Sequence, residues 1–106
     1  MKLAVDIKVS DLDRAVDFYT EILGLSCRRC ESDWAAIVVG DAEIHLYLHG
    51  GVSSDVEFCV ENLERTVEKL RNKNVEVSTI EEFPWGRAAF FKDTEGNTLS
   101  LVKDFE

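Results

Sequence analysis

The sequence predicts an α+β fold made of two similar halves, each with the element order β-α-β-β-β. The first observation is an internal repeat, in which residues 9–19 (VSDLDRAVDFY) match residues 60–70 (VENLERTVEKL) about half the chain length later. The second is that a strand-like stretch precedes each copy, and the third is that three such stretches follow it. Two units are too few for a solenoid, so the halves are expected to close on each other, and a surface between such halves favours a pocket.

The first half begins with alternating apolar and polar residues over 3–9, the signature of a half-buried strand. Asp11 is a good helix N-cap, apolar residues then follow helical spacing to Leu23, and Gly24 is placed to end the helix. Strands are expected over 25–31, 34–39 and 43–49, with Gly40 and Asp41 forming a tight turn between the last two.

The second half repeats this order. A strand is expected over 56–60, and Asn62 is expected to cap a helix that stops at Asn74. Further strands are expected over 75–80, 88–92 and 98–102, with a turn at 93–97 and a break at Pro84. We therefore expect a single domain of residues 1–106, in which residues 51–54 join a module of residues 1–50 to a module of residues 55–106.

Composition excludes several classes of function. A net charge of −9 argues against binding nucleic acid or an anionic membrane, and it would attract cationic ligands or metal ions. No apolar run is long enough to span a membrane, and the N-terminus shows no signal-peptide pattern. A cytoplasmic location is therefore expected.

Three cysteines, Cys27, Cys30 and Cys59, are an odd number, which argues against a disulfide framework. Cys27 and Cys30 form a C-x-x-C motif, but it lies in a strand-like run rather than at a helix N-terminus. Because residues i and i+3 of a regular strand face opposite sides, a redox or zinc role is disfavoured.

Two stretches resemble one known family. Residues 9–19 and the following Leu23-Gly24-Leu25 are similar to the first strand–helix signature of the vicinal oxygen chelate superfamily, which includes glyoxalase I, bleomycin-resistance proteins and extradiol dioxygenases. Residues 84–97 are similar to its C-terminal PWG…F-x-D-P-x-G-N segment, with Thr94 in place of proline. The resemblance implies two βαβββ modules forming a curved eight-stranded mixed sheet around a cleft. It also implies a homodimer.

The resemblance also implies where a metal would bind. The four metal-ligand positions of the family fall on Ala4, His45, Asp55 and Ser100. Alanine has no ligand atom and serine is a poor ligand, so only His45 and Asp55 are candidate ligands, whereas catalytic sites need three or more protein donors. We therefore expect no cofactor, with a weakly bound divalent ion as an alternative that Glu43, His49 or Glu57 would complete. A hydrogen-bonded histidine is the simpler role for His45.

Side-chain alternation predicts two faces for the strands. The apolar positions expected under the helices are Leu3, Val5, Ile7, Ile44, Leu46, Leu48, Val56, Phe58, Val60, Leu99 and Leu101. The polar positions between them are Ala4, Asp6, Lys8, Glu43, His45, Tyr47, His49, Asp55, Glu57, Cys59, Thr98 and Ser100. Two interpretations remain open for the polar side, a solvated sheet face or the lining of an acid-rich cleft.

The functional hypothesis is a small-molecule-binding protein that sequesters a cationic or metal-chelating ligand without the full family metal site. The expected ligand-binding residues are His45, Tyr47, His49, Asp55, Glu57, Trp34, Trp85 and Arg87. The aromatic residues would act as stacking platforms, although core packing is the alternative for each, and surface pairing is the alternative for Arg87. The rival hypotheses are a metal-dependent lyase, isomerase or dioxygenase with a non-standard ligand set, and a non-catalytic dimeric regulatory module.

Overall fold

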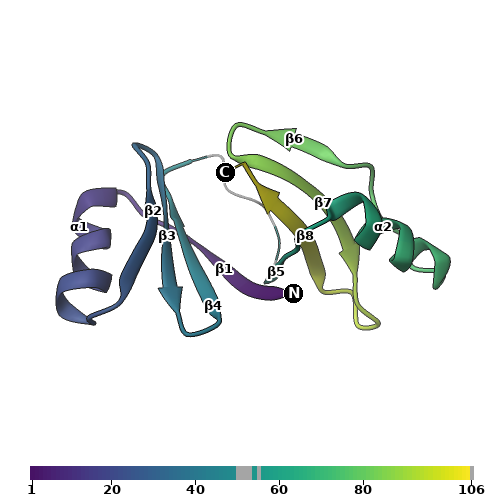
Figure 1. Cartoon of the computed structure of the whole chain (residues 1–106), viewed down its shortest axis with the longest axis horizontal. Coiled ribbons are helices and arrows are strands. Elements are labelled where there is room, and N and C mark those ends of the chain that lie inside the picture. The colour runs from purple at the N-terminus through teal and green to yellow at the C-terminus, as the bar shows by residue number, and fades with distance from the viewer. Residues whose placement is uncertain (50–53, 55, 106) are drawn as a thin grey trace. The chain divides into compact units, whose positions relative to one another are not determined.

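The computed structural model describes residues 1–49, 54 and 56–105. The chain divides into an N-terminal module, Leu3–Ser53, and a C-terminal module, Ser54–Glu106 together with Met1–Lys2. Each module has the predicted element order β-α-β-β-β, which confirms the α+β class and the duplicated architecture (Figure 1). In the part of the chain that is described, neither helix has both the length and the apolar character needed to cross a membrane.

The N-terminal module consists of β1 (Lys2–Lys8), α1 (Leu12–Asp17), a π-helical turn η1 (Phe18–Ile22), β2 (Ser26–Cys30), β3 (Trp34–Val39) and β4 (Ala42–Tyr47). Its four strands lie in the order β2-β3-β4-β1, with β1 parallel to β4 and the other pairs antiparallel. Helix α1 packs on one side of this sheet (Figure 1). The core beneath it is formed by Leu12, Ala35, Ile37 and Leu46.

The C-terminal module consists of β5 (Val56–Cys59), α2 (Leu63–Asn72), β6 (Glu81–Phe83), β7 (Gly86–Lys92) and β8 (Thr98–Asp104). Its strands lie in the equivalent order β5-β8-β7-β6, with β5 parallel to β8. The core between α2 and this sheet is formed by Leu63, Val67, Ala89 and Leu101.

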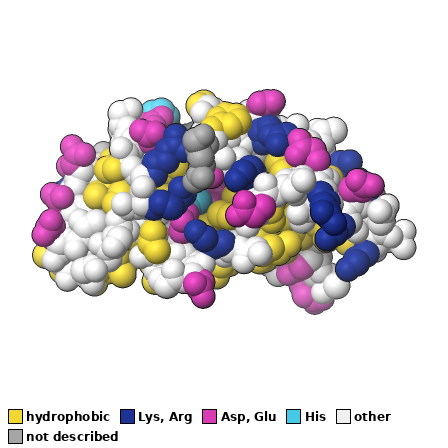
Figure 2. Space-filling model, viewed as in Figure 1, with side chains coloured by type: hydrophobic (Ala, Val, Ile, Leu, Met, Phe, Trp, Pro, Cys, Tyr) yellow, Lys and Arg dark blue, Asp and Glu magenta, His cyan; other side chains and the backbone are white. Residues whose placement is uncertain are grey.

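The two helices begin as the repeat predicts. Asp11 accepts a hydrogen bond from the backbone N–H of Arg14 at 3.1 Å, and Asn62 accepts the equivalent bond from Arg65 at 3.0 Å. These side chains satisfy N–H groups that the first helical turn leaves without a partner. Acidic side chains gather on the outer surface of α1 (Figure 2), as expected for the solvent side of an amphipathic helix.

The first helix differs from the prediction in its last turn, which is π-helical rather than α-helical. The backbone N–H of Leu23 donates to the carbonyl of Phe18, five residues earlier, at 3.1 Å. The hydroxyl of Thr20 donates to the carbonyl of Val16 at 2.8 Å, and such back-bonding competes with the regular helical pattern. Gly24 follows with φ +77°, the left-handed conformation that ends helices.

The strand predicted at 75–80 is wrong, because the structure has no regular secondary structure there and places β6 at Glu81–Phe83. Part of the expected ladder is replaced by side chains. The guanidinium of Arg71 donates to the carbonyls of Val77 and Ser78 at 3.1 and 2.9 Å. The Ser78 hydroxyl accepts from the backbone N–H of Phe90 at 2.8 Å.

The prediction that Leu3 and Ile7 pack under a helix is also wrong, since they are 46% and 37% exposed. Helix α1 covers β3 and β4, and Val9, just beyond the end of β1, reaches the core. The edge position of β1 within its module's sheet therefore leaves these two side chains beyond the helix.

Candidate functional site

One side of the N-terminal sheet is polar, and strand register explains why. Ile44, Leu46 and Leu48 pack on the α1 core, so the alternate residues of β4 point to the opposite side. Three rows result, each with one residue from β1, β4 and β3 in turn: Lys8, Tyr47 and Trp34; Asp6, His45 and Ala36; Ala4, Glu43 and Val38. The predicted alternation of β4 is confirmed.

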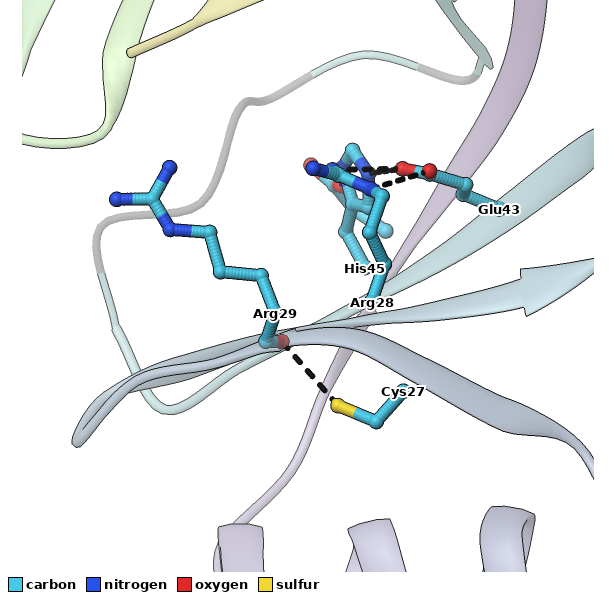
Figure 3. A network of polar contacts seen from close by, with 6 residues as sticks. Cys27, Arg28, Arg29, Glu43 and His45 are labelled. Carbon is cyan, nitrogen blue, oxygen red and sulfur yellow. Dashed lines mark hydrogen bonds and ion pairs between the residues drawn. The ribbon is translucent and has the colours of Figure 1, made fainter. Parts of the chain in front are cut away.

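A hydrogen-bonded network joins three residues of this side (Figure 3). Arg28 of β2 donates from Nε to Glu43 Oε2 at 2.7 Å and from Nη2 to Oε1 at 3.1 Å. His45 Nε2 lies 2.8 Å from Glu43 Oε1. The Glu43 side chain is only 2% exposed, and a buried carboxylate needs charged donors of this kind.

Local structure explains how Arg28 reaches Glu43. Strand β3 presents only the methyl group of Ala36 next to His45, so a long side chain from β2 can cross β3. A register shift between Cys27 and Arg29 places both Arg28 and Arg29 on the polar side (Figure 3). Arg28 was not among the site residues expected from the sequence, because the sequence carries no signal for this bulge.

Further contacts surround His45. Its Nδ1 lies 3.7 Å from Asp6 Oδ1, and its ring meets the Trp34 ring edge-on with centroids 5.9 Å apart. The Arg29 guanidinium lies over the Trp34 ring at 5.3 Å from the centroid. We call the group Asp6, Arg28, Trp34, Glu43, His45 and Tyr47 the polar face of the N-terminal module.

The polar face offers few metal ligands. Ala4 carries no ligand atom, and the Nε2 of His45 is directed at Glu43. Within the N-terminal module, Asp6 Oδ1 and His45 Nδ1 are two donors that lie 3.7 Å apart and do not belong to the Arg28 ion pair. Of the other candidates, His49 is exposed just beyond β4, and Asp55 lies outside the described residues.

The remaining predicted residues belong to the C-terminal module. Glu57 of β5 pairs in register with Ser100 of β8, so the two share one side of that sheet. The Ser100 hydroxyl lies 2.9 Å from the Ser54 hydroxyl. Trp85 stacks on Phe83, with ring centroids 5.2 Å apart and ring planes 11° apart.

Arg87 forms a surface ion pair, which was the alternative to ligand binding expected for this residue. Its Nη2 donates to Glu64 Oε1 at 3.1 Å, which links β7 to α2. This hydrogen bond lowers the pKa of the Glu64 carboxyl and raises the pKa of Arg87. In the register of β7 and β8, Arg87 lies on the α2 side with Ala89 and Leu101, opposite to Ser100.

Comparison with known proteins places the chain in a family. Residues 3–101 match the model of the Glyoxalase/Bleomycin resistance protein/Dioxygenase superfamily. No curated protein matches the sequence.

Solved structures share the fold at low sequence identity. One is described as an NAD-dependent benzaldehyde dehydrogenase from Legionella pneumophila (TM-score 0.72, 12% identity, covering 97% of this chain and 99% of that one). Another is a hypothetical protein from Bacillus halodurans C-125 (TM-score 0.66, 16% identity, covering 99% and 95%). A third is an uncharacterized protein from Methanosarcina mazei (TM-score 0.64, 16% identity, covering 99% and 93%). With the family match spanning nearly all of its residues, the chain belongs to the Glyoxalase/Bleomycin resistance protein/Dioxygenase superfamily.

Proposed function

We propose that this protein binds and sequesters a cationic or metal-chelating small molecule on the polar face, without the full metal site of its superfamily. The observation that carries the proposal is the Arg28–Glu43–His45 network, with contacts of 2.7 to 3.1 Å. In this network the histidine at a family metal position is held by the protein's own side chains. A histidine held in this way is suited to orienting a ligand rather than to coordinating an ion through Nε2.

The other family metal positions support the same proposal. Ala4 provides no donor, and the hydroxyl of Ser100 is already hydrogen-bonded to Ser54 at 2.9 Å. A metal bound through His45 Nε2 would first have to break the contact with Glu43. That step would leave a nearly buried carboxylate with one partner fewer, which costs free energy.

Trp34 supports a cationic or planar ligand. The guanidinium of Arg29 lies over its ring, so the indole face already accepts a planar cation. A ligand cation would replace Arg29 there, and the carboxylate of Asp6, one row from Glu43, would supply the opposite charge. Glu43 contributes less negative potential than the sequence suggests, because Arg28 neutralises it.

Tryptophan fluorescence tests the proposal, since the chain has only two tryptophans. The probe is metal-free bleomycin, a cationic chelator taken from the name of the superfamily. We expect it to quench the wild-type protein, to lose most of that effect with Trp34→Phe, and to retain it with the matched control Trp85→Phe. Equal quenching of the two variants, or binding that Asp6→Asn leaves unchanged, would contradict a ligand site on the polar face.

A second candidate function is a metal-dependent lyase, isomerase or dioxygenase with a relocated ligand set. The observation in its favour is the 3.7 Å separation of Asp6 Oδ1 and His45 Nδ1, which suits two ligands of one divalent ion. This function predicts that His45→Ala abolishes both metal uptake and turnover, while His49→Ala, at the only other histidine, changes neither. Unchanged metal uptake in His45→Ala would remove this candidate.

We further propose that the protein is a homodimer, whether its role is ligand binding or regulation. Apolar side chains at the end of the first helix are largely solvent-exposed, with Phe18 at 50%, Ile22 at 72% and Leu23 at 53%. Neighbouring apolar side chains of this size are typical of a surface that another protein covers.

A further inference from the structure

The C-x-x-C motif has a geometry that the sequence does not indicate. In the register of β2 and β3, Cys27 lies opposite Ile37, Arg29 opposite Ala36 and Cys30 opposite Ala35, so Arg28 is the extra residue of a bulge. Ala35 and Ile37 both belong to the core under α1. Because directly opposed residues share a face, Cys27 and Cys30 point to the same side, and the prediction that they face opposite sides is wrong.

The two thiols form an accessible pair. Figure 3 shows Cys27 on one side of the strand, with Arg28 and Arg29 on the other. Cys27 is half-buried, packs against the α1 core and donates from Sγ to the carbonyl of Arg29 at 3.2 Å, while Cys30 is exposed. Strand β2 is the outermost strand of the sheet, so solvent reaches the pair from its open edge.

We propose that Cys27 and Cys30 form a two-thiolate binding site for a soft monovalent metal ion, with Cu(I) as the ion that fits. Thiolates select soft ions, and Cu(I) is satisfied by two sulfur ligands. Among the described residues, no histidine, cysteine or carboxylate lies close enough to Cys27 and Cys30 to act as a third ligand. A four-ligand zinc site therefore does not fit.

Binding is a ligand exchange without redox change. Each thiol releases its proton to solvent, two Cu–S bonds form, and copper remains Cu(I) in a complex with one net negative charge. Because each thiol must lose its proton to bind the ion, protons compete with the metal, and the affinity for Cu(I) should rise as the pH increases.

A disulfide fits the same geometry less well. The bulge gives Cys27 and Cys30 the spacing of alternate residues on one strand, roughly 6.6 Å between Cα atoms from the rise of a strand. That spacing lies at the upper end of the range that disulfides span. A bridging metal ion holds two sulfur atoms farther apart than a direct S–S bond does, so it imposes less strain.

The test is a titration of the reduced full-length protein with Cu(I) under anaerobic conditions, in competition with the chelator bathocuproine disulfonate. We expect one Cu(I) per chain, with an affinity that increases with pH. Cys30→Ser should weaken binding by more than the roughly 10–100-fold that loss of an outer-shell partner costs. Cys30 is exposed, so this variant should fold normally, which circular dichroism would verify. Cys59→Ser, at the third cysteine, is the matched control and should bind like wild type.

Three results would overturn the proposal. The first is equal affinity of wild type and Cys30→Ser, and the second is loss of Cu(I) binding in Cys59→Ser. The third is isolation of the chain with a mass two hydrogens lower, together with no Cu(I) uptake after reduction, because that result would identify the pair as a disulfide. Cys27→Ala supplies an independent variant, which should lose Cu(I) to the same extent as Cys30→Ser.

Discussion

Glu43 is the residue on which the polar face depends. Its side chain is 2% exposed and accepts hydrogen bonds from Arg28 and His45, so its charge is matched within the N-terminal module. The same contacts fix the His45 ring, because Nε2 faces Glu43 and Nδ1 faces Asp6. A single buried carboxylate thereby sets the orientation of the residues that we expect to meet the ligand.

Loss of Arg28 should therefore destabilise the protein. Arg28→Ala leaves Glu43 with one partner fewer, and we expect a cost of about 1–3 kcal/mol in the free energy of unfolding. This cost in the free energy of unfolding is smaller than for a fully buried ion pair, since the Arg28 side chain is 28% exposed. Urea unfolding measures it, with Arg29→Ala as the matched control on the same side of the strand. Equal stability of the two variants would show that the Glu43 contact contributes little.

Asp93 gives a pH-dependent contribution at the turn between β7 and β8. Its carboxylate accepts from the Asn97 side-chain amide at 2.7 Å and from the backbone N–H groups of Glu95 and Asn97 at 2.8 and 2.9 Å. These bonds, the Asn97 side chain first, lower the pKa of Asp93 in the folded state. The unfolded chain thus binds a proton more readily than the folded chain does.

The stability that Asp93 contributes is present above its unfolded pKa and is lost as the pH falls through its folded pKa. We expect Asp93→Asn to be less stable than wild type near neutral pH and the difference to shrink in acid. Thermal melts of both proteins across this pH range measure the difference. A difference in stability between wild type and Asp93→Asn that stays constant at all pH values would contradict this role of Asp93. In the same turn the backbone N–H of Gly96 donates to the carbonyl of Asp93 at 3.3 Å.

At the scale of elements, the strands and helix starts were largely predictable from sequence. The repeat located both N-caps, and alternation located the faces of β4, because these signals depend on neighbouring residues alone. The predictions that failed depend on contacts between residues far apart in the sequence. The segment at 75–80 is bonded by Arg71 rather than by a full ladder, and the bulge of β2 depends on its pairing with β3.

In the candidate site, too, the residues marked by neighbouring sequence signals were predicted, and those that depend on distant contacts were not. His45 and Tyr47 were found because alternation assigns them to one side of the sheet, whereas Trp34 was chosen as an aromatic platform and shares that side through its pairing with Tyr47. Arg28 was missed because a one-residue bulge reverses the parity of β2 after that point, and no residue of the sequence marks it. The proximity of Asp6 to His45 depends on the register of β1 against β4, which sequence alone does not fix.

Gly86 is a position in β7 where a side chain larger than hydrogen is poorly tolerated. A Cβ placed there would lie 2.6 Å from the Cα of Asp104 and would also meet the backbone carbonyl of Lys103, on the neighbouring strand β8. We expect Gly86→Ala to lower the free energy of unfolding by about 1–3 kcal/mol, because backbone must move. Gly40→Asn is the control, since no atom lies within 4 Å of its Cβ position and asparagine tolerates φ +59°. Near-identical melting temperatures of wild type and Gly86→Ala would refute the close approach.

At the scale of the whole molecule, the chain contains one topology twice. Both modules place a parallel strand pair, β1 with β4 and β5 with β8, inside an otherwise antiparallel sheet. Their sequences have diverged, so that one module carries the Arg28–Glu43–His45 network and the other carries the hydroxyl pair of Ser54 and Ser100. Duplication thus preserved the framework while the polar side chains changed.

The proposed homodimer makes a prediction at this scale. Light scattering should give about twice the chain mass of 12.0 kDa. Ile22→Asp should shift the protein to monomer, because it places a charge on the exposed apolar end of the first helix. Val39→Asp, at an exposed apolar residue of β3, is the control and should remain dimeric. A wild-type protein with the mass of one chain would rule out the dimer.

We expect the polar face to bind small molecules without a tightly held divalent ion. Elemental analysis of the full chain, purified without chelators and then equilibrated with Zn²⁺ and passed through a desalting column, tests it most directly. The Arg28–Glu43–His45 network predicts well under one zinc ion per chain after desalting, because His45 Nε2 stays with Glu43. One zinc ion retained per chain, lost in His45→Ala and kept in His49→Ala, would contradict the claim.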